Sequence, residues 1–111
     1  MKPDKELMGA STALLVLALL AKEPSYGYEV VKRINAESDG LLEWQEGTVY
    51  PILHKLEKEK QVRSQWQEAA SGRRRKYYYI TAQGRERLAD QVEQWNLFHG
   101  LVNRVADVPI S

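Results

Sequence analysis

The hydrophobic period of the chain changes abruptly after Lys60. Before this point apolar residues recur every three or four positions, as on one face of a helix, and after it they alternate with polar residues, as in strands. Residues 62–68 and 75–81 both alternate, and Gly72 between them supplies turn chemistry, which predicts a β-hairpin. A long helical pattern then begins after Thr81. The expected order is therefore helices, a hairpin and one further helix.

Two helices are expected in the first third of the chain. Residues 7–22 form a strongly apolar pattern that ends before Pro24, because proline disfavours a helix at the preceding residue. The second helix is expected to begin with Ser25 as its N-cap and to end near Glu37. Its inward face is expected to consist of Tyr28, Val31 and Ile34.

A third helix is expected to begin near residues 46–48. Pro51 sets this limit, because a proline deep in a helix removes a hydrogen bond or causes a kink. Apolar residues at i, i+3, i+4 and i+7 predict one buried face, made of Val49, Ile52, Leu53 and Leu56. The opposite face collects Gly47, Pro51, His54, Lys55 and Lys58, with Thr48 and Tyr50 at its borders.

The predicted hairpin joins a run of charge to a run of aromatic residues. Residues 73–76 are Arg-Arg-Arg-Lys and lie at the expected tip, and residues 77–79 are three tyrosines that begin the return strand. Tyr78 and Ile80 are expected to face inward, whereas Tyr77 and Tyr79 are expected on the outer face, where a phenol tolerates water. The hairpin would then be a basic finger with an anchored base.

The 111 residues predict one domain with a single core. The formal net charge is only +1, but the positive charge concentrates in residues 61–87, where the acidic residues are Glu68 and Glu86 alone. A concentrated basic patch in a nearly neutral protein indicates an anionic partner. The alternative is a solvated basic surface with no partner.

Several functional classes are disfavoured by the composition. The chain has no cysteine, which excludes disulfides and thiolate metal sites and fits a reducing compartment. His54 and His99 lie on different expected helices without a motif partner, and no glycine-rich phosphate loop is present. The longest apolar run, residues 13–21, is too short to span a bilayer and no signal-peptide cleavage motif follows it. We expect a protein with no catalytic residues, no metal and no cofactor.

Three helices followed by a hairpin are the order of a winged helix-turn-helix, in the mostly helical part of the α+β class. In that fold the third helix enters the major groove of DNA and the hairpin, or wing, contacts the flanking backbone. We expect residues 1–81 to form a DNA-binding domain and residues 82–111 to form a dimerisation helix and tail. The predicted DNA-binding residues are Tyr26, Thr48, Tyr50, Pro51, His54, Lys55, Lys58, Arg73, Arg74, Arg75 and Lys76.

The last helix is expected to run to about Asp107, a length of ~39 Å at about 1.5 Å per residue. This is longer than a domain of this size needs for its own core. Apolar residues recur along it with three- and four-residue spacing, which predicts a helix that pairs with a partner. The alternative is a stripe that folds back on the first helix. The predicted dimer interface is Leu88, Val92, Trp95, Leu101, Val102 and Val105.

Three segments resemble the PadR family of bacterial transcriptional regulators. Residues 19–34 are similar to the end of the family's first helix and its Gly-Tyr-Glu second helix, and residues 47–62 resemble its Gly-Thr-Leu-Tyr-Pro recognition helix. Residues 71–88 resemble its arginine- and tyrosine-rich wing and the entry into the last helix. Val49 departs from the common leucine, and Glu46 places a negative charge near the start of the recognition helix, where it would repel phosphate.

The resemblance implies a cytoplasmic, homodimeric repressor that binds a palindromic operator in double-stranded DNA and whose affinity a small effector changes. In similar members, the tryptophan of a motif like residues 92–95 faces its symmetry mate and can sandwich flat aromatic compounds. Carried over, this makes Trp95 an effector-site candidate, and the alternative is that Trp95 only fills the dimer interface. The candidate effector residues are Trp95, Phe98, Ala10, Ala13 and Leu14.

A winged-helix fold also occurs in proteins that bind other proteins, so the fold alone does not decide the function. In that alternative the basic wing would contact an acidic protein partner. RNA binding through the wing is a further possibility, although the strands carry no known RNA-module signature. Specific duplex binding would fall steeply with salt and retain a preference for one sequence, which separates it from both alternatives.

Overall fold

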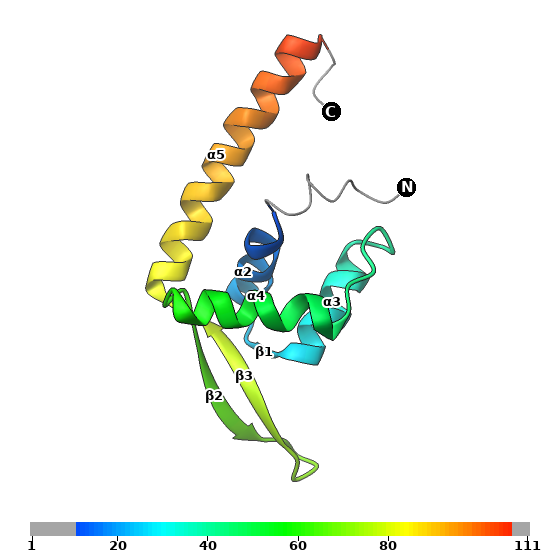
Figure 1. The fold of residues 1–111 in the computed structure, drawn as a ribbon, viewed down its shortest axis with the longest axis vertical. Coiled ribbons are helices and arrows are strands. Elements are labelled where there is room, and N and C mark those ends of the chain that lie inside the picture. The colour runs from blue at the N-terminus through cyan, green and yellow to red at the C-terminus, as the bar shows by residue number, and fades with distance from the viewer. Residues whose placement is uncertain (1–10, 108–111) are drawn as a thin grey trace.

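The computed structural model describes residues 11–107 of the chain. Helices α2, α3 and α4 form one body, from which the β2–β3 hairpin projects on one side and α5 on the other (Figure 1). This is the expected winged helix-turn-helix with a long last helix. The elements are α2 (Thr12–Lys22), β1 (Ser25–Tyr26), α3 (Gly27–Glu37), α4 (Glu46–Lys58), β2 (Val62–Glu68), β3 (Arg74–Ile80) and α5 (Ala82–Ala106).

The core lies between the three helices of the body and the base of the hairpin. On α4 the predicted buried face is confirmed for Val49, Leu53 and Leu56, whereas Ile52 is only partly buried at the edge of the core. The start of α4 at Glu46 also agrees with the position that Pro51 imposes. The buried apolar side chains are Val16, Leu17, Leu19, Leu20, Val30, Val31, Ile34, Val49, Leu53, Leu56, Val62 and Tyr78.

The start of α3 differs from the prediction in two respects. Ser25 is not the N-cap, because Ser25 and Tyr26 form β1, whose two residues pair with Tyr78 and Tyr77 of β3. The N-cap is Tyr26, and the buried Ser25 hydroxyl instead accepts a hydrogen bond of 2.5 Å from Arg33. Tyr28 was expected to face inward, but its side chain is half exposed. Val31 and Ile34 are buried as predicted, and the buried face also includes Gly27 and Val30.

The hairpin has the predicted strands and turn. β1, β3 and β2 lie side by side in that order, and the β2–β3 pair is antiparallel. Gly72 adopts a φ of +84° in the turn, a conformation that a glycine takes without strain. Tyr78 is buried and anchors the hairpin to the core, whereas Tyr79 lies on the other face beneath the guanidinium of Arg63, 4.3 Å from its ring centroid.

The bounds of α5 agree closely with the sequence prediction. The Thr81 side chain caps the helix by accepting a hydrogen bond of 3.0 Å from the Gly84 amide, and Asp107 ends it in a left-handed conformation. Gly84 is buried against the backbone of Gln61, which fixes the first turn of α5 to the base of the wing. Beyond this point α5 extends away from the body (Figure 1). No helix within residues 11–107 is long and apolar enough to cross a membrane.

Candidate nucleic-acid interface

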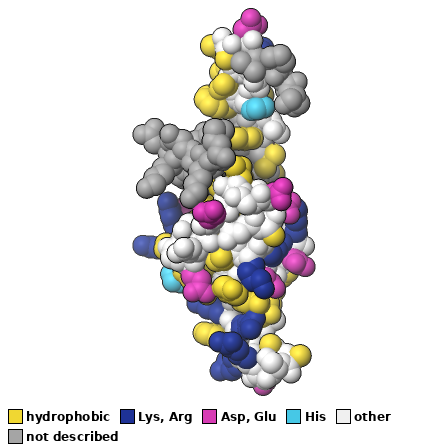
Figure 2. All heavy atoms as spheres, turned by 90° about the vertical axis from the view of Figure 1, so that its right-hand side faces the viewer, with side chains coloured by type: hydrophobic (Ala, Val, Ile, Leu, Met, Phe, Trp, Pro, Cys, Tyr) yellow, Lys and Arg dark blue, Asp and Glu magenta, His cyan; other side chains and the backbone are white. Residues whose placement is uncertain are grey.

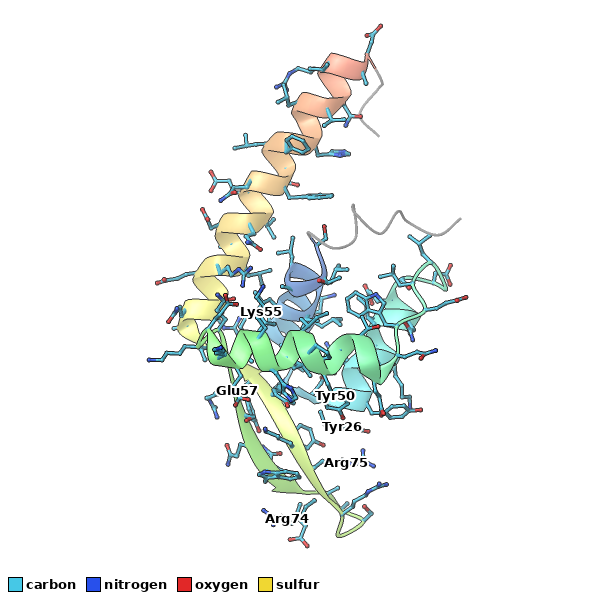
Figure 3. All side chains as sticks on the ribbon, in the orientation of Figure 1. Tyr26, Tyr50, Lys55, Glu57, Arg74 and Arg75 are labelled. Atoms are coloured by element: carbon cyan, nitrogen blue, oxygen red, sulfur yellow. The ribbon has the colours of Figure 1, made fainter. Side chains whose placement is uncertain are left out.

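A groove of about 580 Å³ lies between α4, the start of α3 and the wing. We call it the wing groove. Figure 3 shows Tyr26, Tyr50 and Arg75 gathered on this side of α4, above the hairpin tip. Its walls combine aromatic side chains from the helices and strands with the four consecutive cations of the wing. The aromatic and cationic lining residues are Tyr26, Tyr28, Tyr50, Trp66, Tyr78, Arg73, Arg74, Arg75 and Lys76.

The predicted outer face of α4 divides into two rows. Tyr50 and His54 lie one turn apart and line the wing groove together with Glu46. The second row points away from the groove, and Figure 3 shows Lys55 on a different side of α4 from Tyr50. The structure thus brings two of the predicted α4 residues together with the wing cations and leaves the rest on the outer surface. The exposed second row consists of Thr48, Pro51, Lys55 and Lys58.

Tyr50 owes its position to a glycine. A Cβ atom at Gly27 would lie 2.5 Å from ring atoms of Tyr50, so only glycine allows this ring to lie over the start of α3. Burial raises the pKa of the Tyr50 hydroxyl, and the nearby Glu46 carboxylate raises it further. The ring centroid of His54 lies 6.3 Å away. Tyr50 therefore presents a protonated hydroxyl, a hydrogen-bond donor, at the wall of the groove.

Two wing arginines lie over aromatic rings. The guanidinium of Arg75 is 4.2 Å from the ring centroid of Tyr26, and that of Arg74 is 5.6 Å from Trp66. Tyr26 is itself held edge-on by Tyr77, at a centroid distance of 5.5 Å. Cation–π contacts of this kind contribute about 0.5–1 kcal/mol at exposed sites. They orient the guanidinium groups without neutralising their charge, so the groups can still attract an anion.

Lys76 lies 5.7 Å from the ring centroid of Tyr78 and has a carboxylate partner as well. Its ammonium nitrogen lies 3.9 Å from the carboxylate of Glu57 on α4. The hydroxyl of Ser64 on β2 donates a hydrogen bond to the same carboxylate. Glu57 therefore connects α4 to both strands of the wing, and Figure 3 shows it on the wing side of α4.

Sequence reasoning did not identify Trp66, Tyr28 or Glu57 as residues of this region. Trp66 is 57% exposed and lines the groove, although Val62 on the same face of β2 is buried. The alternation of β2 contained a usable signal, because the face that begins in the core at Val62 continues beyond the core to Trp66. The link through Glu57 had no such signal, since it depends on how closely the wing packs against α4.

The predicted dimer residues all lie on α5, and all except Leu88 are exposed. Leu88 packs against the core of its own chain. Leu97, which was not predicted, is also exposed, one helical turn before Leu101. Figure 2 shows hydrophobic side chains along the upper part of the molecule and Lys and Arg side chains gathered near its lower end. We use the term α5 stripe for the exposed residues Val92, Trp95, Phe98, Leu101, Val102 and Val105.

The candidate effector residues are divided between α2 and α5. Ala13 and Leu14 are partly buried on α2, which packs against α5, whereas Trp95 and Phe98 are exposed on α5. Ala10 lies outside the described residues. Residues 11–107 contain no group of three or more His, Asp or Glu side chains able to hold a metal ion.

Comparison with known proteins identifies the family. The model of the transcriptional regulator PadR-like family matches residues 16–90. The chain belongs to this family. Proteins of the PadR-like family are transcriptional regulators that bind DNA, and not enzymes. The resemblance found in the three sequence segments is therefore confirmed.

Solved structures agree with this PadR-like assignment over nearly the whole chain. A transcriptional regulator from Clostridium thermocellum has 30% identity and a TM-score of 0.83, with 92% of this chain and 96% of that chain covered. A PadR-like transcriptional regulator from Bacillus cereus has 27% identity and a TM-score of 0.82, with 95% and 100% covered. An uncharacterised protein from Lysinibacillus sphaericus is 30% identical over 81 residues, which are 73% of this chain and 74% of that protein.

Proposed function

We propose that this PadR-like regulator binds a palindromic operator as a homodimer and represses transcription until a small aromatic effector binds. The observation that carries the proposal is the position of its two exposed surfaces. The wing groove gathers cations and hydrogen-bonding side chains toward one end of the molecule, and the α5 stripe exposes apolar side chains toward the other end (Figure 2). Residues 1–81 would act as the DNA-binding domain and residues 82–111 as the dimerisation helix and tail.

The two rows of α4 and the wing would have different roles on DNA. Hydrogen bonds to base edges read the sequence, whereas phosphate contacts provide affinity and register. We assign base reading to α4 and phosphate contacts to the wing arginines, whose charge is not cancelled by a carboxylate within the described residues. On α4 and at the N-cap of α3, the contacting residues would be Tyr26, Thr48, Tyr50, Pro51, His54, Lys55 and Lys58. On the wing they would be Arg73, Arg74 and Arg75.

The α5 stripe supports a homodimer. α5 has 25 residues, and its apolar side chains continue past the body, where no other described element covers them. A contiguous exposed apolar patch on a protein of this size is typical of an interaction surface. A second copy of α5 would cover it with side chains of the same kind. Two-fold pairing would then present two copies of α4 to half-sites about 34 Å apart.

An effector site would be completed only in the dimer. Trp95 lies within the stripe and is 46% exposed, so a second copy of α5 brings a second indole to the same interface. Flat aromatic molecules stack between such rings. Binding would change DNA affinity only by as much as the effector prefers one orientation of the two DNA-binding domains over another.

The test is selection of bound sequences from a random duplex library at near-physiological salt. The proposal expects a palindrome with two half-sites about one helical turn apart. A bound pool identical to the input would contradict sequence-specific reading and favour an acidic protein as the partner of the wing. A single, non-repeated half-site would contradict the homodimer while leaving DNA binding in place.

A further inference from the structure

Glu57 occupies the junction between the sequence-reading helix and the wing. One of its carboxylate oxygens accepts the hydrogen bond from Ser64 of β2, and the other lies 3.9 Å from the ammonium nitrogen of Lys76 on β3. Ser64 pairs with Tyr78 and Trp66 pairs with Lys76, so both contacts are made on the strand face that turns toward α4. A single side chain of α4 thus holds both strands of the wing.

Lys76 also lies over an aromatic ring, that of Tyr78, but its carboxylate partner makes it unlike the neighbouring cations. Arg74 and Arg75 lie over aromatic rings, which leave the positive charge and the N–H groups able to bind an anion. The Glu57 carboxylate instead compensates the charge of Lys76, and both side chains are about one-third exposed. Within residues 11–107, Lys76 is the one cation of residues 73–76 with a carboxylate partner. Lys76 is therefore suited to a structural contact and poorly placed for a phosphate contact.

We propose that Glu57 determines the specificity of DNA binding by retaining Lys76 as a link between the wing and α4. This inference rests on the proposed function. With the link intact, the wing arginines contact phosphates only when α4 lies in a fixed position relative to them. Without it, Lys76 becomes a sequence-independent phosphate ligand, and the wing binds duplexes on which α4 makes no base contact. Glu57 is thus a positioning residue that lowers non-specific affinity.

The direct test is Glu57→Gln, with affinity for operator and for unrelated duplex measured between 50 and 300 mM salt. Glutamine keeps the shape and still accepts a hydrogen bond from Ser64, but it removes the charge that retains Lys76. We expect affinity for unrelated duplex to rise about fivefold to tenfold per protomer near 0.1 M salt. The slope of log K against log salt should steepen by about 0.9 per protomer, and the ratio of specific to non-specific affinity should fall.

A matched control is Glu59→Gln. Glu59 adjoins the end of α4 and its removal changes the net charge equally, but its ion pair of 3.6 Å is with Arg87 of α5 and not with the wing. A general electrostatic effect would raise both affinities equally in the two variants. The proposal instead expects a steeper slope and a lower specificity ratio in Glu57→Gln alone.

The reciprocal variant, Lys76→Gln, tests the same link if Glu57→Gln does not fold. Its slope should remain close to the wild-type slope, whereas Arg74→Gln should lose about 0.9 per protomer. The double variant Glu57→Gln/Lys76→Gln should lose the gain in non-specific affinity. An unchanged salt slope in Glu57→Gln, or equal losses of affinity for operator and for unrelated duplex, would overturn this inference and leave the proposed function standing. A wild-type protein that binds no duplex would overturn the proposed function as well.

Discussion

The wing groove and the α5 stripe both expose large side chains, but only the groove holds them with contacts from its own chain. Arg75 lies on Tyr26, Arg74 lies on Trp66 and Tyr50 lies over Gly27. Along the described part of α5, Phe98 is 62% exposed and Val105 is 78% exposed. The cations of the wing groove are already oriented by neighbouring side chains and can bind an anionic partner. The apolar side chains of the α5 stripe instead favour a partner that removes them from water.

This difference suggests how the two surfaces cooperate. Under the proposed function, the groove of a single copy would bind DNA weakly, because its internal contacts are already formed within one chain. In the proposed dimer the stripe would give no affinity for DNA, but it would couple two grooves so that the second binding event becomes intramolecular. Variants of the stripe should therefore change assembly and variants of the groove should change recognition, and the following predictions test that separation.

The largest expected effect is on assembly. Val102→Glu places a charge in the middle of the α5 stripe, and an unpaired charge buried in an interface costs about 3–5 kcal/mol. Sedimentation equilibrium should show a dimer for the wild type and a monomer for the variant, with little change in helix content. The control is Ala89→Glu, which introduces the same charge at an exposed position of α5 roughly 140° around the helix from Val102 and should leave the dimer intact. Equal dissociation by both variants would contradict the assignment of the stripe.

The next effect concerns the wall of the groove. Gly27→Ala introduces a Cβ atom 2.5 Å from the Tyr50 ring, so the ring must move, and we expect a loss of about 1–3 kcal/mol in the free energy of unfolding. Gly47→Ala is the control, because no atom lies within 4 Å of its added Cβ. That change should be neutral or should stabilise α4 by up to about 1 kcal/mol. Urea denaturation measures both, and equal stabilities would show that Tyr50 does not depend on Gly27.

A smaller effect separates affinity from sequence preference within the groove. Arg74→Gln should weaken binding to every duplex by a similar factor and reduce the salt slope by about 0.9 per protomer. His54→Ala should instead alter the order of preference among operator variants by about 1 kcal/mol at the positions it contacts. Fluorescence-anisotropy titrations on a panel of single-base operator variants would measure both. Parallel losses on all sequences from both changes would contradict the assignment of base reading to this row of α4.

The smallest effect is a pH dependence. The pKa of Tyr50 is raised above its ordinary value of 10.0, first by burial and then by Glu46. The folded protein therefore keeps the proton in a range where the unfolded chain loses it, and stability should fall as the pH rises above about 10. Ultraviolet titration of the tyrosines should detect this group, and Glu46→Gln should lower its pKa only in part because burial remains. A complete return to the ordinary value would identify Glu46 as the main cause.

Features set by local sequence could be predicted closely. Thr81 caps α5 where the helical pattern begins, Gly72 lies in the wing turn and the apolar spacing of α4 identifies Val49, Leu53 and Leu56 as buried. Each of these depends on a few neighbouring residues. The fold as a whole could be predicted from the family-specific motifs, because three of them occur in order along most of the chain.

Features set by packing could not be predicted. β1 has only two residues, too few for an alternating pattern, and it exists because β3 lies beside it. Tyr28 matched the three-residue spacing of Val31 and Ile34, but the orientation of α3 leaves it half exposed. The contact between Glu57 and Lys76 joins residues far apart in sequence, and no spacing rule indicates it. These three unpredicted features all lie at or beside the wing groove, where elements distant in the sequence meet.

The most direct test of the account is the salt dependence of binding to one palindromic duplex, compared between the wild type and Val102→Glu. With about three phosphate contacts per protomer, the wild-type dimer should give a slope of log K against log salt of roughly −5. The monomeric variant should give about half that slope and equal affinity for the full palindrome and for one half-site. An unchanged slope in a monomeric Val102→Glu protein would contradict the claim that α5 joins two wing grooves on one DNA.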